Sequence, residues 1–199
     1  TGFKYIGEQI KWFEQNHSHN YVFGLEESYG CLAGTYARDK DACVAVMMLC
    51  EVASWCKKHG KTLWDAMIDL YEKYGYYREG LSTMTLKGID GAAQIQQMMS
   101  DMRNNPKKRL GGFEVLAVRD YKEDTRKDLK TGEVTKTGLP ASNVLYYELE
   151  DDAWVCVRPS GTEPKVKFYL GVKGTSLEDA DAKSKALSES VHAMINKML

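Results

Sequence analysis

Residues 158–164 read Arg-Pro-Ser-Gly-Thr-Glu-Pro and combine the chemical groups that bind a phosphate. Arg158 carries a permanent positive charge on a planar fork that matches two phosphate oxygens. Ser160 and Thr162 add hydroxyl donors, and Gly161 lets the backbone bend so that N–H groups can converge on an anion. The run therefore predicts a phosphate-binding loop. A plain turn is the alternative, because turns use the same residue types.

Two strand-like segments flank this loop, residues 153–158 before it and residues 165–170 after it. Side chains alternate between the two faces of a strand, so Lys165 and Lys167 share one face while Val166 lies on the other. Both cations can therefore project toward the side on which a phosphate would bind.

A second candidate site follows the short strand predicted at residues 21–24. Glu26 and Ser28 lie just past the carboxyl end of this strand, where α/β folds bind ligands. A carboxylate and a hydroxyl two residues apart can hydrogen-bond the hydroxyls of a sugar. A solvated loop is the alternative interpretation.

A third candidate is the charged run at residues 38–41, Arg-Asp-Lys-Asp, at the start of a predicted long helix. The helix dipole does not favour a cation at this end. Together with the exposed N–H groups of a helix N-terminus, however, a cation here can hold a phosphate. A surface charge cluster is the alternative.

The composition is that of an ordinary globular protein, with 199 residues, 43% hydrophobic and 28% charged. A net charge of −1 argues against a general nucleic-acid or membrane-surface binder, so any anion site must be local. The longest apolar run, residues 42–50, is too short to span a bilayer. The five cysteines form no Cys-x-x-Cys pair, which favours reduced thiols and a cytoplasmic location.

Residues 1–75 are predicted to hold three helices and one clear strand. The helices are expected at residues 3–15, at 40–59 with Asp39 as N-cap, and from Thr62 to residue 74 with Asp65 in a capping box. One strand cannot form a sheet, so we interpret this half as an incomplete α/β domain. The residues expected to be buried on the second and third helices are Ala42, Val46, Leu49, Ala53, Cys56, Leu63, Ala66, Met67, Leu70 and Tyr74.

A hinge is predicted at residues 76–80, and a second domain over residues 81–199. Strands are expected at residues 81–87, 113–121, 144–150, 153–158 and 165–171, with helices at 90–104 and 177–198. This pattern predicts an α+β domain in which helices pack on an antiparallel sheet. The charged segment 122–137 is expected to be a mobile loop.

The phosphate-loop run, followed by a Lys-rich strand, resembles the phosphate-binding loop of the α-D-phosphohexomutases, the phosphoglucomutase/phosphomannomutase family. Three further runs resemble that family. Glu26-Glu27-Ser28 is similar to its Gly-Glu-x-Ser-Gly sugar loop, although Leu25 stands where the family has its first Gly. Residues 38–41 resemble its Arg-x-Lys-Asp segment, and residues 1–4 its Thr-Gly-x-Lys loop. The resemblance implies sugar contacts for Glu26, Ser28, Thr1 and Gly2, and phosphate contacts for Arg158, Ser160, Gly161, Thr162, Lys167 and Lys40.

The resemblance covers only the C-terminal part of such an enzyme, the end of domain 3 and all of domain 4. It implies a parent that moves a phosphoryl group between the 1- and 6-positions of a hexose, using a phosphoserine and Mg²⁺. The Asp-Gly-Asp-x-Asp-Arg metal loop does not occur in this sequence, and Ser18-His19-Asn20 is only a fragment of the phosphoserine loop. We therefore expect no catalytic residue, metal ligand or cofactor in this chain. His17 and His19 are expected to lie in an exposed turn.

We accordingly interpret the chain as an excised, inactive, substrate-binding fragment. Its expected partners are a hexose phosphate and the N-terminal domains of the same enzyme, with no nucleic acid and no membrane. Glu26-x-Ser28 favours glucose or mannose phosphates over glucosamine phosphates. Two alternatives stay open, a stand-alone phosphosugar-binding module without catalysis and an interaction protein whose loops are only turns.

Overall fold

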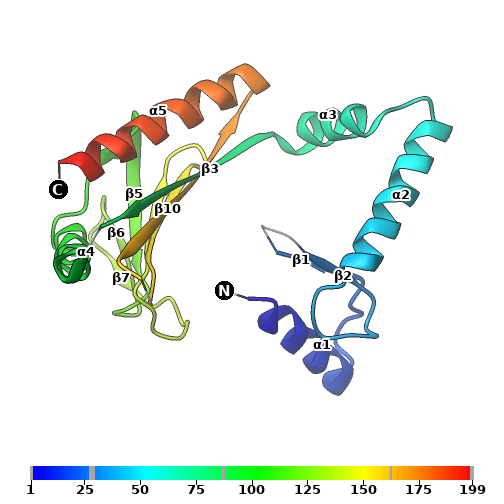
Figure 1. The fold of residues 1–199 in the computed structure, drawn as a ribbon, viewed down its shortest axis with the longest axis horizontal. Helices are drawn as coiled ribbons and strands as arrows, with labels where there is room; N and C mark the ends of the chain where they lie inside the picture. The colour runs from blue at the N-terminus through cyan, green and yellow to red at the C-terminus, as the bar shows by residue number, and fades with distance from the viewer. Residues whose placement is uncertain (1, 27–29, 87, 162, 198–199) are drawn as a thin grey trace. The chain divides into compact units, whose positions relative to one another are not determined.

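A computed structural model describes residues 2–26, 30–86, 88–161 and 163–197 (Figure 1). The chain divides into two compact units, Thr1–Leu70 and Tyr71–Leu199, and each is described by itself. The division falls within helix α3, Leu63–Tyr74.

The first unit contains two helices, two short strands and most of α3. Its elements are α1 (Lys4–Asn16), β1 (Phe23–Leu25), β2 (Cys31–Ala33), α2 (Ala42–Lys58) and the first part of α3. A small core of Phe3, Ile10 and Leu32 joins α1 to β2, and Ile6, Tyr21 and Ala37 pack against it. The predicted helix at residues 3–15 is confirmed to within one residue at each end.

Strand β2 was not predicted. One clear strand is expected from the sequence in residues 1–75, but residues 31–33 form a second one, which pairs antiparallel with β1 in the register Phe23↔Ala33 and Leu25↔Cys31. The N–H of Glu26 donates to the carbonyl of Gly30 at 2.9 Å, which turns the chain back on itself. The glycine-rich composition concealed a hairpin.

The N-cap of α2 also differs from the prediction. Asp41, not Asp39, accepts from the backbone N–H groups of Cys43 at 2.9 Å and Val44 at 3.1 Å. Asp39 instead binds the side chain of Lys40. The helix therefore begins after the charged run, and not within it.

The N-terminus of α3 confirms the predicted capping box. The Asp65 carboxylate accepts from the Thr62 N–H at 2.7 Å, and the Asp65 N–H donates to the Thr62 hydroxyl oxygen at 3.1 Å. Two orphan donors at the start of the helix are thereby satisfied.

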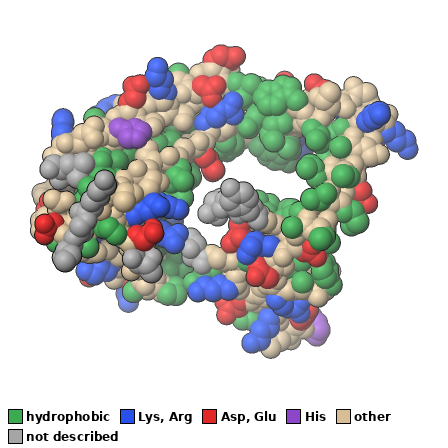
Figure 2. All heavy atoms as spheres, viewed as in Figure 1, with side chains coloured by type: hydrophobic (Ala, Val, Ile, Leu, Met, Phe, Trp, Pro, Cys, Tyr) green, Lys and Arg blue, Asp and Glu red, His purple; other side chains and the backbone are tan. Residues whose placement is uncertain are grey.

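The predicted apolar faces of α2 and α3 are exposed in this unit. Val46 is 63% exposed and Leu49 56%, and of the stripe expected on α2 only Cys56 is buried. Leu70 on α3 is 51% exposed, and Figure 2 shows hydrophobic side chains at the surface along these helices. An apolar stripe is buried only against another layer. The described part of this unit offers these faces only two three-residue strands.

The second unit is an antiparallel sheet packed by helices, as predicted for residues 81–199. Its strand order is β3-β10-β9-β8-β5-β6-β7, with β4 pairing β5. The elements are β3 (Tyr76–Thr85), α4 (Gly88–Asn104), β4 (Arg109–Leu110), β5 (Phe113–Asp120), β6 (Thr125–Asp128), β7 (Val134–Thr135), β8 (Leu145–Leu149), β9 (Trp154–Pro159), β10 (Lys165–Gly174) and α5 (Leu177–Asn196).

The residues expected to form a hinge, 76–80, belong to β3 in the structure. Tyr76 pairs with Gly174 and Gly80 with Leu170, so the strand continues without a break to Thr85. Tyr76 and Tyr77 suit a strand because aromatic side chains pack well on a pleated surface. The flanking glycines gave the misleading signal of a linker.

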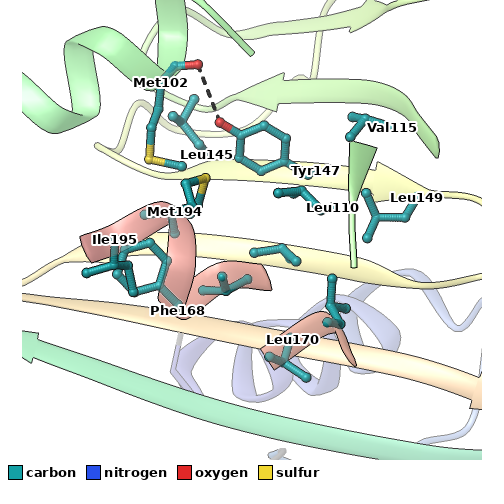
Figure 3. Packing of buried hydrophobic residues seen from close by; sticks show 14 of the residues in the cluster. Met102, Leu110, Val115, Leu145, Tyr147, Leu149, Phe168, Leu170, Met194 and Ile195 are labelled. Atoms are coloured by element: carbon teal, nitrogen blue, oxygen red, sulfur yellow. Dashed lines mark hydrogen bonds between the residues drawn. The ribbon is translucent and has the colours of Figure 1, made fainter. Parts of the chain in front are cut away.

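The core of this unit lies between the sheet and its helices, α4 and α5 (Figure 3). Along β9 and β10 every second side chain is buried, including Val157, Val166 and Phe168 at 0% exposure. Figure 3 shows Met194 and Ile195 of α5 close to Phe168. Helix α5 confirms the prediction, because Ser176 caps its N-terminus and its inward residues are Ala180, Leu187, Val191, Met194 and Ile195.

The segment expected to be a mobile loop, residues 122–137, forms the β6–β7 hairpin. The Asp124 carboxylate accepts from the N–H groups of Thr137 at 3.1 Å and Gly138 at 2.8 Å. Asp128 closes the hairpin turn by accepting from Lys130 and Thr131. The high charge of this segment suggested a loop, but two of its carboxylates, those of Asp124 and Asp128, accept backbone hydrogen bonds that hold the hairpin.

Glu148 of β8 joins this hairpin to the rest of the sheet. Its carboxylate lies 2.6 Å from the Arg126 guanidinium and 2.5 Å from that of Arg119. The hydrogen bond from Arg126 is the main cause that holds the pKa of Glu148 below its usual value. The ionised form therefore stabilises the fold at neutral pH.

We predict that replacing Glu148 with Gln reduces the acid sensitivity of the second unit. A carboxyl group with a lowered folded-state pKa contributes stability above its unfolded pKa, and this is lost as the pH falls through the folded value. Urea unfolding midpoints between pH 6 and pH 3 should therefore fall more for wild type than for Glu148→Gln. Exposed Glu123→Gln is the control and should behave as wild type. Equal acid sensitivity of wild type and Glu148→Gln would show that the ion pairs of Glu148 with Arg119 and Arg126 do not stabilise this unit.

A second prediction concerns two adjacent glycines, Gly111 and Gly112, which have φ values of +58° and +93°. A Cβ on Gly111 would lie 2.5 Å from the Cα of Leu187 in α5, whereas one on Gly112 meets nothing within 4 Å. Gly112→Ala should lower the free energy of unfolding by about 1–2 kcal/mol, because alanine rarely adopts a positive φ. Gly111→Ala should lower it by about 2 kcal/mol more, because α5 must also shift to make room for the Cβ. Urea unfolding checks the order, and equal losses would show that α5 does not approach Gly111 this closely.

Candidate functional site

The predicted phosphate loop connects β9 to β10 and is closed by its own hydrogen bonds. The Ser160 N–H donates to the Lys165 carbonyl, and the Lys165 N–H donates to the Glu163 carbonyl, both at 2.7 Å. The Glu163 N–H also donates to the Ser160 hydroxyl oxygen at 3.3 Å. These bonds hold the described part of the loop in a defined turn at the ends of β9 and β10.

This turn changes the expected roles of two loop residues. The N–H of Ser160 is engaged within the turn, so it does not point at an anion in this conformation. Gly161 does not adopt a left-handed φ, and a Cβ added to it would meet nothing within 4 Å. The bend therefore does not require a glycine here, contrary to the prediction from the sequence. Thr162 lies outside the described residues.

Arg158 and Lys167 are directly opposite each other on neighbouring strands. Their chain neighbours Val157 and Val166 are buried, so both cations stand on the face away from α4 and α5. Neither forms an ion pair with another residue that the structure describes. Like charges directly opposite on a sheet destabilise it. An anion bound between the two cations would remove that repulsion.

Cys156 lies on the same face, two residues before Arg158 on β9. Burial raises the pKa of its thiol to about 11, despite the opposing effect of the Arg158 charge. The thiol is therefore neutral at physiological pH and does not offset the two cations. Lys165, by contrast, has a carboxylate 3.9 Å away on Glu163.

Strand β3 brings two further polar residues to this face, which the sequence reasoning missed. Thr83 pairs with Lys167, and Thr85 pairs with Lys165. Thr83 points away from the helices because its neighbour Ser82 is buried and contacts His192 of α5 at 3.0 Å. The sequence did not reveal this pairing because β3 and β10 lie far apart in the chain. The alternation of side chains along a strand could, however, have placed Thr83 and Thr85 together on the face opposite Ser82.

In the first unit, Lys40 connects three segments that are separate in the sequence. Its ammonium lies 2.8 Å from the Asp39 carboxylate and 3.5 Å from that of Glu26. It also lies 5.5 Å from the centre of the Phe3 ring. The hydrogen bond to Asp39 is the largest cause that raises the pKa of Lys40, burial opposes it, and the charges of Asp39 and Glu26 add smaller increases. Lys40 is therefore charged and lies beside the predicted sugar-binding carboxylate.

The other predicted contributors near Lys40 are engaged elsewhere or lie outside the described residues. Arg38 binds both carboxylate oxygens of Glu14 at 2.7 Å, and the first N–H groups of α2 donate to Asp41. The expected contribution of a helix N-terminus to phosphate binding is therefore not present, and Lys40 can act only through its ammonium. Gly2 is described and exposed next to Phe3. Thr1 and Ser28 lie outside the described residues.

Within the described ranges, no group of three or more His, Cys, Asp or Glu side chains is placed to hold a metal ion. In the same residues, no helix combines the length and the apolar character that crossing a membrane requires.

Two family models match this chain. Residues 1–74 match the model of phosphoglucomutase/phosphomannomutase, alpha/beta/alpha domain III, and residues 103–185 match that of phosphoglucomutase/phosphomannomutase, C-terminal domain. The phosphoglucomutase of Staphylococcus aureus strain bovine RF122 / ET3-1 is 36% identical over 187 residues, which are 94% of this chain and 33% of that protein. The phosphoglucomutase of Staphylococcus aureus strain MRSA252 is 35% identical over the same coverage.

The chain spans about a third of the length of these curated relatives. The two matched models together cover more than half of the chain, and they describe the third domain and the C-terminal domain of one family. The comparisons agree with the observed order of an α/β segment followed by an α+β domain, and the chain therefore belongs to the phosphoglucomutase/phosphomannomutase family, of which it is a C-terminal portion.

Proposed function

We propose that this chain is the substrate-binding part of a phosphohexomutase that interconverts hexose 1-phosphates and 6-phosphates through a bisphosphate intermediate. The pairing of Arg158 with Lys167 carries this proposal. Two cations face each other on one side of a sheet with no carboxylate partner among the described residues, which suits a bound phosphate. The phosphoglucomutase relatives support a hexose phosphate as the ligand.

Each unit offers its own candidate contacts. Arg158 and Lys167 hold the phosphate that is not reacting, because a guanidinium stays charged and binds phosphate oxygens at two points. Glu26 accepts hydrogen bonds from sugar hydroxyls, and Lys40 beside it attracts a phosphate. Ser160, Gly161, Thr162, Thr1, Gly2 and Ser28 are proposed as further contacts on the family resemblance alone.

This binding contributes to catalysis through positioning. Phosphoryl transfer depends mainly on holding the reacting groups in line and on stabilising charge. Mg²⁺ and a phosphoserine elsewhere in the whole enzyme would supply charge neutralisation and the transferable phosphoryl group. The residues of this chain bind and orient the sugar phosphate, and they neutralise its distal phosphate.

We predict that phosphate stabilises the second unit and that Lys167→Met abolishes this effect. A ligand that binds only the folded state raises the unfolding midpoint according to its concentration and Kd. The measurement is urea unfolding in phosphate and in chloride at equal ionic strength. Wild type should be more stable in phosphate, and Lys167→Met should show no difference. In chloride the variant should be at least as stable as wild type, since one of two repelling charges is gone.

Lys165→Met is the matched control, because Lys165 lies on the same strand and face but has Glu163 as a partner. It should keep most of the phosphate effect. Arg158→Ala should lose phosphate affinity by about tenfold to a hundredfold, as expected for charge-assisted hydrogen bonds. If phosphate stabilises Arg158→Ala and Lys167→Met as much as wild type, this face is not a phosphate site.

A further prediction concerns activity. The purified chain should bind glucose 1-phosphate but should not convert it to glucose 6-phosphate with Mg²⁺ and glucose 1,6-bisphosphate present, because the sequence has no Asp-Gly-Asp-x-Asp-Arg run. A coupled assay for glucose 6-phosphate checks this, with full-length phosphoglucomutase as the positive control. Metal-dependent turnover by this chain alone would refute the division of labour.

A further inference from the structure

Gly30 lies at the point where the chain enters β2, and its carbonyl accepts the hydrogen bond from the Glu26 N–H at 2.9 Å. A Cβ added to Gly30 would lie 2.8 Å from Cγ of Lys40 and 3.1 Å from its Cβ. The φ of Gly30 is outside the left-handed range. Its requirement for glycine is therefore a matter of space and not of backbone conformation.

The space over Gly30 is filled by the aliphatic stem of Lys40. This arrangement brings the ammonium to 3.5 Å from the Glu26 carboxylate and 5.5 Å from the centre of the Phe3 ring, while its chain neighbour Asp39 lies 2.8 Å away. A side chain at position 30 would push the stem away, because a flexible lysine moves more easily than the hairpin backbone. The ammonium would then leave the neighbourhood of Glu26.

We propose that Gly30 is a positioning residue for Lys40, and that the Lys40–Glu26 pair makes this site select a phosphorylated sugar over free phosphate. The proposal rests on the proposed function, because it assumes that the site binds a hexose phosphate.

The selectivity follows from how each ligand can replace the ion pair. A hexose phosphate offers an anion to Lys40 and hydroxyl donors to Glu26, so both partners are satisfied again when the pair opens. Inorganic phosphate satisfies only Lys40 and places its own charge beside the Glu26 carboxylate. A neutral sugar satisfies only Glu26. The pair therefore penalises every ligand that lacks one of the two groups.

Glu26→Gln tests whether the charge of Glu26 sets the selectivity. The amide is similar in size to the carboxylate, but it neither repels phosphate nor holds the lysine by charge. Inorganic phosphate should bind the first unit more tightly in this variant than in wild type. The ratio of the affinity for glucose 1-phosphate to the affinity for phosphate should fall by on the order of tenfold.

The test of Gly30 is a double-mutant cycle with Lys40. Binding of inorganic phosphate and of glucose 1-phosphate is measured from the amide NMR shifts of residues 31–33, in the 199-residue chain carrying Arg158→Ala. That background weakens the anion site of the second unit. Gly30→Ala and Lys40→Ala should each weaken glucose 1-phosphate binding by on the order of tenfold. The double variant should bind no worse than Lys40→Ala, because Gly30 acts only through the lysine stem.

Gly34→Ala is the matched control. Gly34 follows β2, has φ +76°, and would place a Cβ where nothing lies within 4 Å. Its alanine strains the same hairpin without touching Lys40, so the ratio of the two affinities should stay at its wild-type value. Circular dichroism of each variant identifies any that fails to fold. If Gly30→Ala fails to fold, the double variant with Lys40→Ala, which lacks the crowding lysine stem, should fold, and its failure to do so would contradict the proposal.

The outcomes separate this inference from the proposed function. If glucose 1-phosphate shifts no amide in either unit of the wild-type chain, the proposed function fails. If it binds, but Gly30→Ala keeps the wild-type affinity ratio or adds fully to Lys40→Ala, the positioning role of Gly30 is wrong. If Glu26→Gln leaves the preference for glucose 1-phosphate unchanged, the ion pair does not set the selectivity.

Discussion

Burial of one face of the antiparallel sheet is the constraint on which the second unit depends. Val157, Val166 and Phe168 must lie against the helices, and the two-residue period of a strand then fixes every neighbour on the opposite face. Arg158 and Lys167 are thereby held in direct opposition without a carboxylate partner among the described residues. A one-residue slip of either strand would bury a cation, so the core enforces the arrangement that suits an anion.

The first unit positions its candidate site by different means. Its core is small, and the apolar faces of α2 and α3 stay exposed, so packing fixes less of the structure. Local contacts position the site residues of this unit instead. The Glu26–Gly30 hydrogen bond turns the hairpin, and the missing side chain at Gly30 leaves room for Lys40. Three segments that resemble substrate-binding motifs then meet around one ammonium group.

The sequence predicted what depends on local periodicity and failed where pairing over long distances decides. Helix α5 and its five inward residues followed from spacing alone, and so did the strands on either side of the phosphate loop. Strand β2 was missed because its glycine-rich surroundings suggested a loop, whereas the hydrogen bond from the Glu26 N–H orders the backbone there. The β6–β7 hairpin was missed because its charge suggested a loop, whereas hydrogen bonds to the Asp124 carboxylate order it. Thr83 was missed because its partner Lys167 lies far away in the sequence. The predicted phosphate contacts of the loop depended on free N–H groups, and the turn itself uses that of Ser160.

We expect an anion to bind between Arg158 and Lys167. The most direct measurement is a crystal structure of the chain with glucose 1-phosphate. We predict that its phosphate group lies within hydrogen-bonding distance of both side chains, on the face of the sheet away from α4 and α5. A structure in which the phosphate binds elsewhere, for example at the basic run of residues 107–109, while Arg158 and Lys167 stay unoccupied, would contradict it.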